Sequence, residues 1–229
     1  MMIKTELHEI QRNILVALLI NKSCHFSKLN SDKLPTDQFS FHIRELIKGN
    51  LITKLDDGSY QLTTEGKEFA NRFDTDSKHV ERQPKSGVVL LVTEGSKILV
   101  HQRLKHPYYG FHGFISGKIR FGESVAETAK RELAEESGLT GKVQLIGIEH
   151  KTDCDEAGTV LEDKFFYIFQ VSETRGKLQE QFDQGKNIWV ERDRVLKLPD
   201  LFNDIEQMLG LLDKKDISFF ENRFKVSGF

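Results

Sequence analysis

Three glutamates within a single helical turn form the strongest chemical pattern of this 229-residue chain. Glu132, Glu135 and Glu136 stand at positions i, i+3 and i+4, a spacing that places the carboxylates on one face of a helix. Like charges at this spacing repel by about 0.2–0.5 kcal/mol per pair, and a bound cation would reverse that sign. Carboxylate oxygens suit a hard divalent ion, Mg²⁺ first and Mn²⁺ second. The pattern therefore predicts a metal-assisted phosphate site, in which the ion neutralises a diphosphate and lowers the pKa of an attacking water.

A capped helix is predicted to present these carboxylates. Ser124 is a suitable N-cap, and Glu127 three residues later completes a capping box. Gly138 is a typical C-terminal stop, so we expect the helix to end at about Ser137. The neighbouring stripe of the helix is apolar and is expected to pack against a sheet. It consists of Ala126, Ala129 and Leu133.

The segment from Gly117 to Leu139 resembles the signature of the Nudix hydrolase family. It fits Gly-x5-Glu-x7-Arg-Glu-apolar-x-Glu-Glu-x-Gly-apolar at every specified position. The resemblance covers about residues 85–212, including a later strand with Trp189 and a helix near 199–212. It implies an α/β/α sandwich with a mixed sheet. It also implies a Mg²⁺-dependent hydrolase that acts on the phosphoric anhydride bond of a nucleotide-type substrate.

The same resemblance implies roles for individual residues of the motif. Glu132, Glu135 and Glu136 look like the metal ligands, with Glu136 or a metal-bound hydroxide nearest the nucleophilic water. Arg131 would hold a carboxylate, that of Glu123, by a charge-assisted pair that orients the loop on the helix. These five residues are therefore the expected catalytic set.

The loop before the helix departs from the family pattern. Gly117 and Gly122 are expected to permit a tight loop, with a main-chain carbonyl near Ser116 or Gly117 reaching the metal. The frequent Pro-Gly-Gly is here Ile115-Ser116-Gly117, and His112 stands where Trp is usual. Many family members add a later acidic residue as ligand or general base. That assignment stays open here among Glu162, Asp163, Glu173, Glu180 and Asp183.

Residues upstream of the motif are candidates for substrate binding. The stretches 87–93 and 97–103 are typical of a hairpin of aliphatic strands, and His101 and Arg103 alternate along its second strand. Arg103 is either a phosphate contact or a solvated strand-edge residue. Tyr109 and Phe111, together with Tyr108, either stack on a nucleobase or pack in the core.

A second module is predicted in residues 1–74. Helical spacing from Leu7 to Leu18 is followed by a brief helix near 27–30 and a longer helix from Pro35 to Gly49. A hairpin around Gly58 and a last helix over 64–73 complete the order. This order, and the string FSFHIRELIKGNLITKLDDGSYQLTTEGKEF, resembles winged helix-turn-helix transcription regulators.

By that resemblance the second long helix would enter the major groove of double-stranded DNA. Its candidate base-reading residues are Thr36, Gln38, Ser40, His42 and Arg44, and His42 is expected at the surface. Two basic residues of 35–48 are balanced by two acidic ones, so attraction to phosphates is small. The alternative is that the module only docks a protein or mediates association.

The organisation predicted from these patterns is α+β. A winged helix-turn-helix domain at 1–74 is followed by a linker at 75–86 and by a Nudix domain at 87–229. The stretch 217–229 contains four phenylalanines, which indicates docking onto a neighbouring segment or onto the second subunit of a homodimer.

Composition restricts the compartment and the partners. Lys and Arg total 33 against 35 Asp and Glu, a net charge of -2, so the whole molecule does not attract polyanions. The two cysteines are distant in sequence and form neither a disulfide framework nor a zinc motif. The longest apolar run has seven residues, whereas a membrane span needs about 20. With no visible signal peptide, we expect a cytoplasmic protein without membrane contact.

Two functions are compatible with these features. The first is a pyrophosphohydrolase that cleaves a diphosphate linkage in a nucleoside diphosphate derivative, fused to a DNA-binding winged helix. The alternative is a transcription regulator whose Nudix domain only senses a nucleotide. A sensor is expected to tolerate loss of the metal carboxylates, whereas all of them remain here, which favours hydrolysis.

Overall fold

The computed structural model describes residues 7–74, 80–227 and 229 and divides into two compact units, Met1–Arg82 and Gln83–Phe229. We call them the N-terminal and the C-terminal unit. Within the described ranges, no helix is both long and apolar enough to span a membrane.

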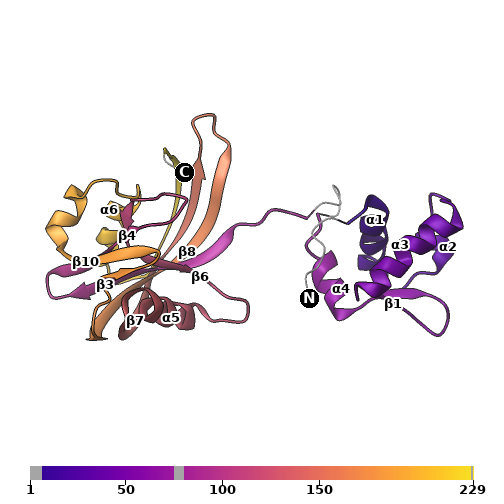
Figure 1. Cartoon of the computed structure of the whole chain (residues 1–229), viewed down its shortest axis with the longest axis horizontal. Coiled ribbons are helices and arrows are strands. Elements are labelled where there is room, and N and C mark those ends of the chain that lie inside the picture. Colours follow the sequence, from indigo (N-terminus) through magenta and orange to yellow (C-terminus); the bar gives the residue numbers. More distant parts are fainter. Residues whose placement is uncertain (1–6, 75–79, 228) are drawn as a thin grey trace. The chain divides into compact units, whose positions relative to one another are not determined.

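The N-terminal unit contains four helices and one hairpin among its described residues, in the predicted order (Figure 1). The elements are α1 (Glu9–Leu19), α2 (Phe26–Leu29), α3 (Thr36–Lys48), β1 (Ile52–Lys54), β2 (Tyr60–Leu62) and α4 (Thr64–Ala70). Apolar faces of the three longer helices and the hairpin meet in one core. Its most buried members include Ile14, Leu15, Leu46, Ile52 and Ala70.

His42 is buried on the inner face of α3, so its predicted surface position is wrong. It lies three residues after Phe39 and four before Leu46, and these spacings place all three side chains toward the core. Its ring centroid is 4.5 Å from that of His8, and burial together with His8 lowers the pKa of His42. A side chain in this position cannot read a DNA base.

The other residues predicted to contact DNA occupy the outer part of α3. Gln38 and Arg44 are exposed, as is Thr36 at the first turn, and Ser40 is half-buried. Helix α3 therefore has an apolar inner face and a mainly polar outer face, on which Phe41 and Ile47 are also exposed.

Strand β3 begins within the last residues of the predicted linker at 75–86. Residues 75–79 lie outside the described ranges, Val80 forms an isolated bridge with Phe73, and strand β3 already begins at Lys85. The first residues of the C-terminal unit thus belong to its sheet.

The C-terminal unit is built on a mixed sheet. Its strands are β3 (Lys85–Glu94), β4 (Lys97–Arg103), β5 (His112–Gly113), β6 (Ile115–Lys118), β7 (Leu139–Cys154), β8 (Val160–Gly176), β9 (Gln181–Phe182), β10 (Gly185–Glu191) and β11 (Ser218–Lys225). The order across the sheet is β11-β7-β8-β3-β4-β10-β9, with β6 pairing with β3 and β5 pairing with β4. The pairs β3·β8 and β11·β7 are parallel, and the others are antiparallel.

Helices cover both faces of this sheet, α5 (Val125–Ser137) on one and α6 (Ile205–Leu211) on the other (Figure 1). Strand β3 shows why. Val88 and Leu90 belong to the cluster under α5, whereas Val89 and Leu91 belong to the cluster under α6. Because side chains alternate along a strand, an uninterrupted apolar run fills both cores, which gives the expected α/β/α layers.

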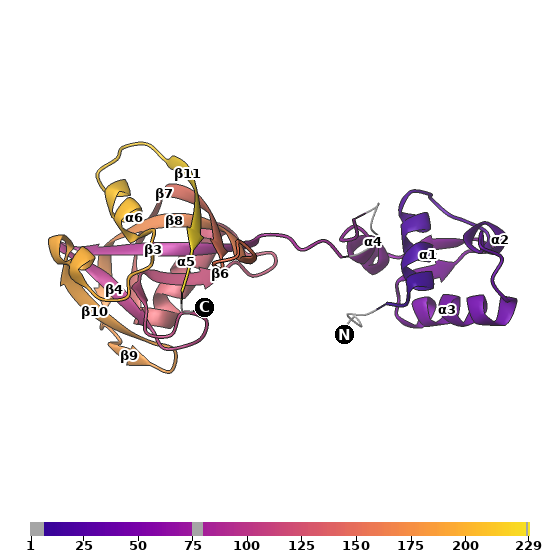
Figure 2. The same cartoon turned by 90° about the horizontal axis from the view of Figure 1, so that it is seen from above.

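The phenylalanine-rich segment near the C-terminal end forms an edge strand, in which Phe220 and Phe224 are half-buried and Phe219 is exposed. Strand β11 pairs in parallel with β7, with Phe220 opposite Glu149 and Phe224 opposite Asp153 (Figure 2). Phe220 packs into the core under α6, and the ring of Phe229 meets that of Tyr108 at 5.6 Å. The segment therefore completes its own unit.

His150 on β7 links β11 to the sheet, and this link predicts a pH-dependent stability. Its Nδ1 lies 2.9 Å from Glu221 and its Nε2 lies 2.8 Å from Asp163, so both nitrogens have carboxylate acceptors. These two bonds raise the pKa of His150, the one with Glu221 most. Because the pKa of His150 is higher in the folded chain, its protonation stabilises the fold fully at a pH below the unfolded pKa of about 6.5. This stabilisation is lost as the pH rises through the folded pKa.

We expect His150→Gln to destabilise the C-terminal unit at pH 5.5 and to have little effect at pH 9. The difference should stay below about 1 kcal/mol because the pairs are partly solvated. Urea unfolding followed by the fluorescence of Trp189, the only tryptophan, measures it in this unit alone. Glu221→Gln should reproduce part of the effect, and an equal loss at both pH values would contradict the assignment.

Candidate active site

Helix α5 begins and ends where the sequence predicts. The Glu127 amide donates to the Ser124 hydroxyl at 3.3 Å, and the Ser124 amide donates to the Glu127 carboxylate at 2.9 Å, which closes the capping box. Gly138 ends the helix with a φ of 71°, a left-handed conformation that favours glycine. The caps fix the register that places the carboxylates.

The three glutamates of α5 differ in their exposure to solvent. Glu132 is buried and Glu136 half-buried, and both line a cavity, whereas Glu135 is exposed. The reason is geometric, because positions i+3 and i+4 of a helix lie on opposite sides of position i and span an arc of about 100°. Glu135 falls on the solvent side of that arc, where it pairs with Arg120 at 3.3 Å.

Arg131 ties the loop before α5 to the helix, and its expected pair with Glu123 is present. Its Nε and Nη2 donate to the two Glu123 oxygens at 2.7 and 2.9 Å, a bidentate arrangement. Its Nη1 donates to Glu132 at 2.6 Å and to Glu135 at 3.1 Å. Arg131 holds the pKa of Glu123 down to about 2. Four charged side chains are thus locked into one arrangement.

Gly117 is required for a different reason from the tight loop that the sequence suggests. It lies in strand β6, opposite Val88, and a Cβ on it would fall 1.8 Å from the carboxyl carbon of Glu132. Only a residue without a side chain leaves room for that carboxylate. Gly122 does occupy a turn, with a φ of 84°.

Glu136 is a carboxyl group whose surroundings disfavour its charged form. Burial and then the nearby charge of Glu132 raise the pKa of Glu136 to about 7, although a backbone hydrogen bond from Ser116 acts in the opposite direction. Among the described residues it forms no salt bridge. A buried carboxyl group of this kind is suited to take part in proton transfer near neutral pH or to bind a cation.

The carboxylates that line the cavity suit a hard divalent ion, although they do not form a complete metal-binding group in this arrangement. Among the described residues, no three His, Cys, Asp or Glu side chains are grouped to hold a metal. Glu132 and Glu136 nevertheless supply all-oxygen ligands beside Ser116 and Gly117, which line the same cavity. The residues therefore fit Mg²⁺ chemically, with Glu135 turned away in the arrangement seen.

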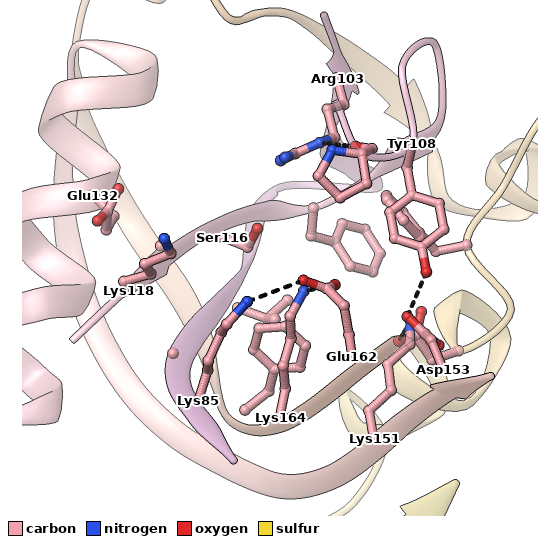
Figure 3. Close-up of a pocket in the computed structure, with 18 of the residues that line it drawn as sticks. Lys85, Arg103, Tyr108, Ser116, Lys118, Glu132, Lys151, Asp153, Glu162 and Lys164 are labelled. Atoms are coloured by element: carbon pink, nitrogen blue, oxygen red, sulfur yellow. Dashed lines mark hydrogen bonds and ion pairs between the residues drawn. The ribbon is translucent and has the colours of Figure 1, made fainter. Parts of the chain in front are cut away.

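A cavity of about 710 Å³ extends from these carboxylates across the sheet (Figure 3). Its volume is that of a site for a small molecule of nucleotide size. Cationic side chains dominate the part near α5, with Arg103, Lys105, Lys118 and Arg120 on its wall. Such a wall favours an anion with several phosphate oxygens.

Of the three residues predicted to contact the substrate, one lines the cavity and two do not. Arg103 lines the cavity, and its Nε donates to the carbonyls of Lys105 and Pro107 at 3.0 and 2.6 Å. Tyr109 is exposed and Phe111 packs on Tyr108, and neither lines the main cavity. Tyr108 itself lines it, so the neighbouring aromatic residue is the one at the site.

Glu162, one of the acidic residues left open as general base, lies in the cavity with two lysines that the sequence analysis did not identify. Glu162 accepts ion pairs from Lys85, at 3.5 Å, and from Lys164. It is the one member of the acidic set left open as general base that lines the cavity, within the described residues. Its carboxylate is thus held by two lysines.

A second missed group lies on β7 and α6. Lys151 donates to Asp204 at 2.7 Å, and Tyr108 donates to Asp153 at 2.7 Å. All four side chains are buried. The alternation of Lys151 and Asp153 on one strand was a visible signal, but their partners come from elements about 45 to 53 residues away.

Comparison with known proteins decides the family of this chain. The family model of the NUDIX domain matches residues 81–211, more than half of the sequence. The chain belongs to the NUDIX domain family. This chain is 27% identical in sequence to a MutT protein from Bacillus halodurans, whose crystal structure superposes with a TM-score of 0.55. The match covers 63% of this chain and 93% of the MutT chain. A MutT NUDIX hydrolase structure from Burkholderia pseudomallei shares the fold at 21% identity, with a TM-score of 0.50 over 57% of this chain and 99% of its own.

Two curated relatives match the NUDIX unit in sequence. The ADP-ribose pyrophosphatase of Methanocaldococcus jannaschii is 34% identical over 76 residues, 33% of this chain and 45% of the relative. The RNA pyrophosphohydrolase of Caulobacter vibrioides is 37% identical over 73 residues, 32% of this chain and 41% of the relative. The chain thus spans less than half the length of the curated relatives it matches.

Proposed function

We propose that the NUDIX unit hydrolyses the diphosphate linkage of a nucleoside diphosphate derivative in the presence of Mg²⁺, with Mn²⁺ as a substitute. The observation that carries this proposal is the cavity itself, where Glu132 and Glu136 share one wall with Arg103 and Lys118. Carboxylates for a cation and cations for phosphate oxygens stand within one site of nucleotide size.

The residues of α5 and of the neighbouring strands would have separate roles. Glu132 and Glu136, with a main-chain carbonyl at Ser116 or Gly117, would hold the ion, which when bound neutralises phosphate charge and makes a water more acidic. Glu136 would accept the proton of the attacking water on its carboxylate. Arg131 would keep Glu132 oriented, and Arg103 would bind a phosphate oxygen. Glu123 acts through Arg131 as a positioning residue.

The names of the two curated relatives support the substrate class. One is called an ADP-ribose pyrophosphatase and the other an RNA pyrophosphohydrolase, so both act on pyrophosphate bonds. We therefore propose ADP-ribose, nucleotide sugars and dinucleotides as first substrates for this chain, with nucleoside triphosphates and RNA as further members of the panel.

A hydrolysis panel tests the proposal. The purified full chain is incubated with each compound and Mg²⁺, and release of mononucleotide is followed by chromatography. We expect hydrolysis of at least one diphosphate compound, its loss in EDTA and its recovery with Mg²⁺ or Mn²⁺. Absence of turnover across the whole panel with both ions would refute the hydrolase.

We further propose that the N-terminal unit is a winged helix that binds double-stranded DNA through α3. The order of its elements and the exposure of Gln38 and Arg44 on the outer face of α3 support this. Thr36, Gln38, Ser40 and Arg44 remain as base-reading candidates, since His42 is buried. Association of protein chains through the same face is the competing use.

Arg44→Glu is expected to weaken DNA binding at least tenfold, because it reverses a charge on the proposed contact face. The full chain is first used to select fragments from a random-sequence DNA pool, and binding is then measured by fluorescence anisotropy at fixed salt. Lys67→Glu on the exposed side of α4 makes the same charge change as a control and should have a smaller effect. Equal effects of the two changes would contradict recognition by α3.

The nucleotide-sensing regulator remains the alternative function. Two results together would favour it. The selected DNA would bind with an affinity that changes when a nucleotide is added, and no compound of the panel would be hydrolysed. The same two experiments therefore distinguish the two functions.

A further inference from the structure

The part of the cavity beyond the cationic wall has a different chemical character. Its charged side chains form pairs of opposite sign rather than a positive surface. They are Lys85, Lys151, Lys164, Asp153, Glu162 and Asp204. Three positive and three negative groups leave this part without net charge, so it is unsuited to a further phosphate and suited to a neutral group that forms hydrogen bonds.

Asp153 has an unused acceptor in this part of the cavity. Its side chain lines the cavity and the residue is only 2% exposed. One oxygen, Oδ2, accepts from Tyr108, while the other, Oδ1, has no hydrogen-bond partner among the described residues. The nearest cation, Lys151 Nζ, is 4.0 Å from Oδ1, too far for a hydrogen bond. A buried carboxylate oxygen without a donor is costly, which points to a donor supplied by a ligand.

Aromatic rings beside Asp153 indicate a flat ligand. Tyr108 and Phe202 both line the cavity, with their ring centroids 5.3 Å apart at an angle of 73°. Figure 3 shows Tyr108 directed at Asp153, on the side of the cavity away from Glu132 on α5. A compound whose phosphates lie at the cationic wall would extend its other half toward this side.

Lys151 supplies a donor next to the free acceptor. Its Nζ carries three N–H groups, and one of them is used by Asp204. An acceptor and a donor side by side match the edge of a base that carries an amino group next to a ring nitrogen, as adenine does. A base held in the same position and orientation, but with a carbonyl oxygen in place of the amino group, would face Asp153 with lone pairs against a carboxylate.

We propose that Asp153 is a specificity-determining residue, which accepts a hydrogen bond from the exocyclic amino group of the substrate's nucleobase while Lys151 donates to the adjacent ring nitrogen. The inference rests on the proposed function and narrows its substrates to nucleoside diphosphate derivatives with an amino-bearing base. The Tyr108 hydroxyl is a positioning group, because it holds the Asp153 carboxylate.

Two compounds that differ only at this group test the inference. ADP-ribose has a 6-amino group, and its hypoxanthine analogue has a 6-oxo group on the same diphosphate and sugars. We expect the wild-type chain to favour ADP-ribose at least tenfold in kcat/KM, mainly through KM. In Asp153→Asn the ratio should fall to within threefold, since an amide can donate to the oxo group and accept from the amino group. This wild-type comparison does not depend on any variant folding.

Asp155→Asn is the matched control. Asp155 lies two residues further along the chain and outside the cavity, so its variant should keep the wild-type ratio. A wild-type ratio within twofold, or a tenfold ratio retained by Asp153→Asn, would overturn the inference while leaving hydrolysis intact. If neither compound is hydrolysed, titration calorimetry of the two intact compounds applies the same ratio test to binding, and the full panel decides the proposed function separately.

Discussion

Glu136→Gln is expected to lower the rate of diphosphate hydrolysis by about 10²–10⁴-fold while the protein stays folded. Glutamine keeps the size of the side chain but can neither accept the proton of the attacking water nor offer a charged oxygen to a divalent ion. Glu136 lines the cavity without a salt bridge among the described residues, whereas Glu132 and Glu162 are each held in ion pairs. Steady-state rates with saturating Mg²⁺ on the best substrate of the panel measure the loss.

The same substitution is expected to stabilise the metal-free protein at alkaline pH. The pKa of Glu136 is raised from 4.5 to about 7, so its charged form is disfavoured in the folded chain. The resulting loss of folding stability is absent at a pH below 4.5, the pKa in the unfolded chain. It grows between pH 4.5 and pH 7 and is complete above the folded pKa of about 7. Glu136→Gln should thus raise the unfolding free energy at pH 8 by on the order of 1–3 kcal/mol and leave it nearly unchanged at pH 4.5.

Glu127→Gln on the same helix is the matched control for both measurements. Its side chain serves the capping box, in which glutamine is also accepted, and it does not line the cavity. We expect near wild-type rates and stability. A Glu136→Gln protein as fast as the wild type would eliminate the proposed mechanism, whatever its stability.

Gly117→Ala should have the second largest effect, because it places a methyl group where the Glu132 carboxyl group lies. The Cβ would be 1.8 Å from the Glu132 Cδ and 2.0 Å from its Oε1, so the Glu132 carboxylate must leave the position in which Arg131 holds it. We expect a stability loss of about 1–3 kcal/mol from overpacking. A displaced Glu132 should also lower hydrolysis by roughly 10²-fold, as misplacement by about 1 Å does elsewhere.

A double-mutant cycle isolates this contact. In a Glu132→Ala background the obstructing carboxyl group is gone, so Gly117→Ala should cost much less stability there than in the wild type. Gly210→Ala in α6 is the control glycine, since a Cβ at that position meets no atom within 4 Å. Equal stability losses in both backgrounds would show that Gly117 is not required by Glu132.

Local signals in the sequence predicted the helix that carries the chemistry. Ser124, Glu127 and Gly138 fix its ends through side-chain caps and a left-handed residue, and these interactions involve only near neighbours in the chain. The apolar run of β3 and the family resemblance predicted the layers. The position of His42 was also accessible, because its spacing to Phe39 and Leu46 is that of a buried helical face.

Features that depend on strand register could not be predicted. Lys151 and Asp153 reach the cavity only because β7 pairs with β8, and Asp153 then stands opposite Glu162. A one-residue shift of that pairing would turn the side chains to the other face. The same holds for β11, whose parallel pairing with β7 joins segments about 70 residues apart. Side-chain direction in a helix likewise separated Glu135 from its two neighbours.

Strand β3 has a consequence for how the C-terminal unit comes apart. It pairs with β4, β6 and β8, and its side chains enter the clusters under both helices. No part of the unit can open around it without breaking two layers at once. In native-state hydrogen exchange, the amides of Val89 to Val92 should therefore exchange only through complete unfolding, and their protection should report the global stability of the unit.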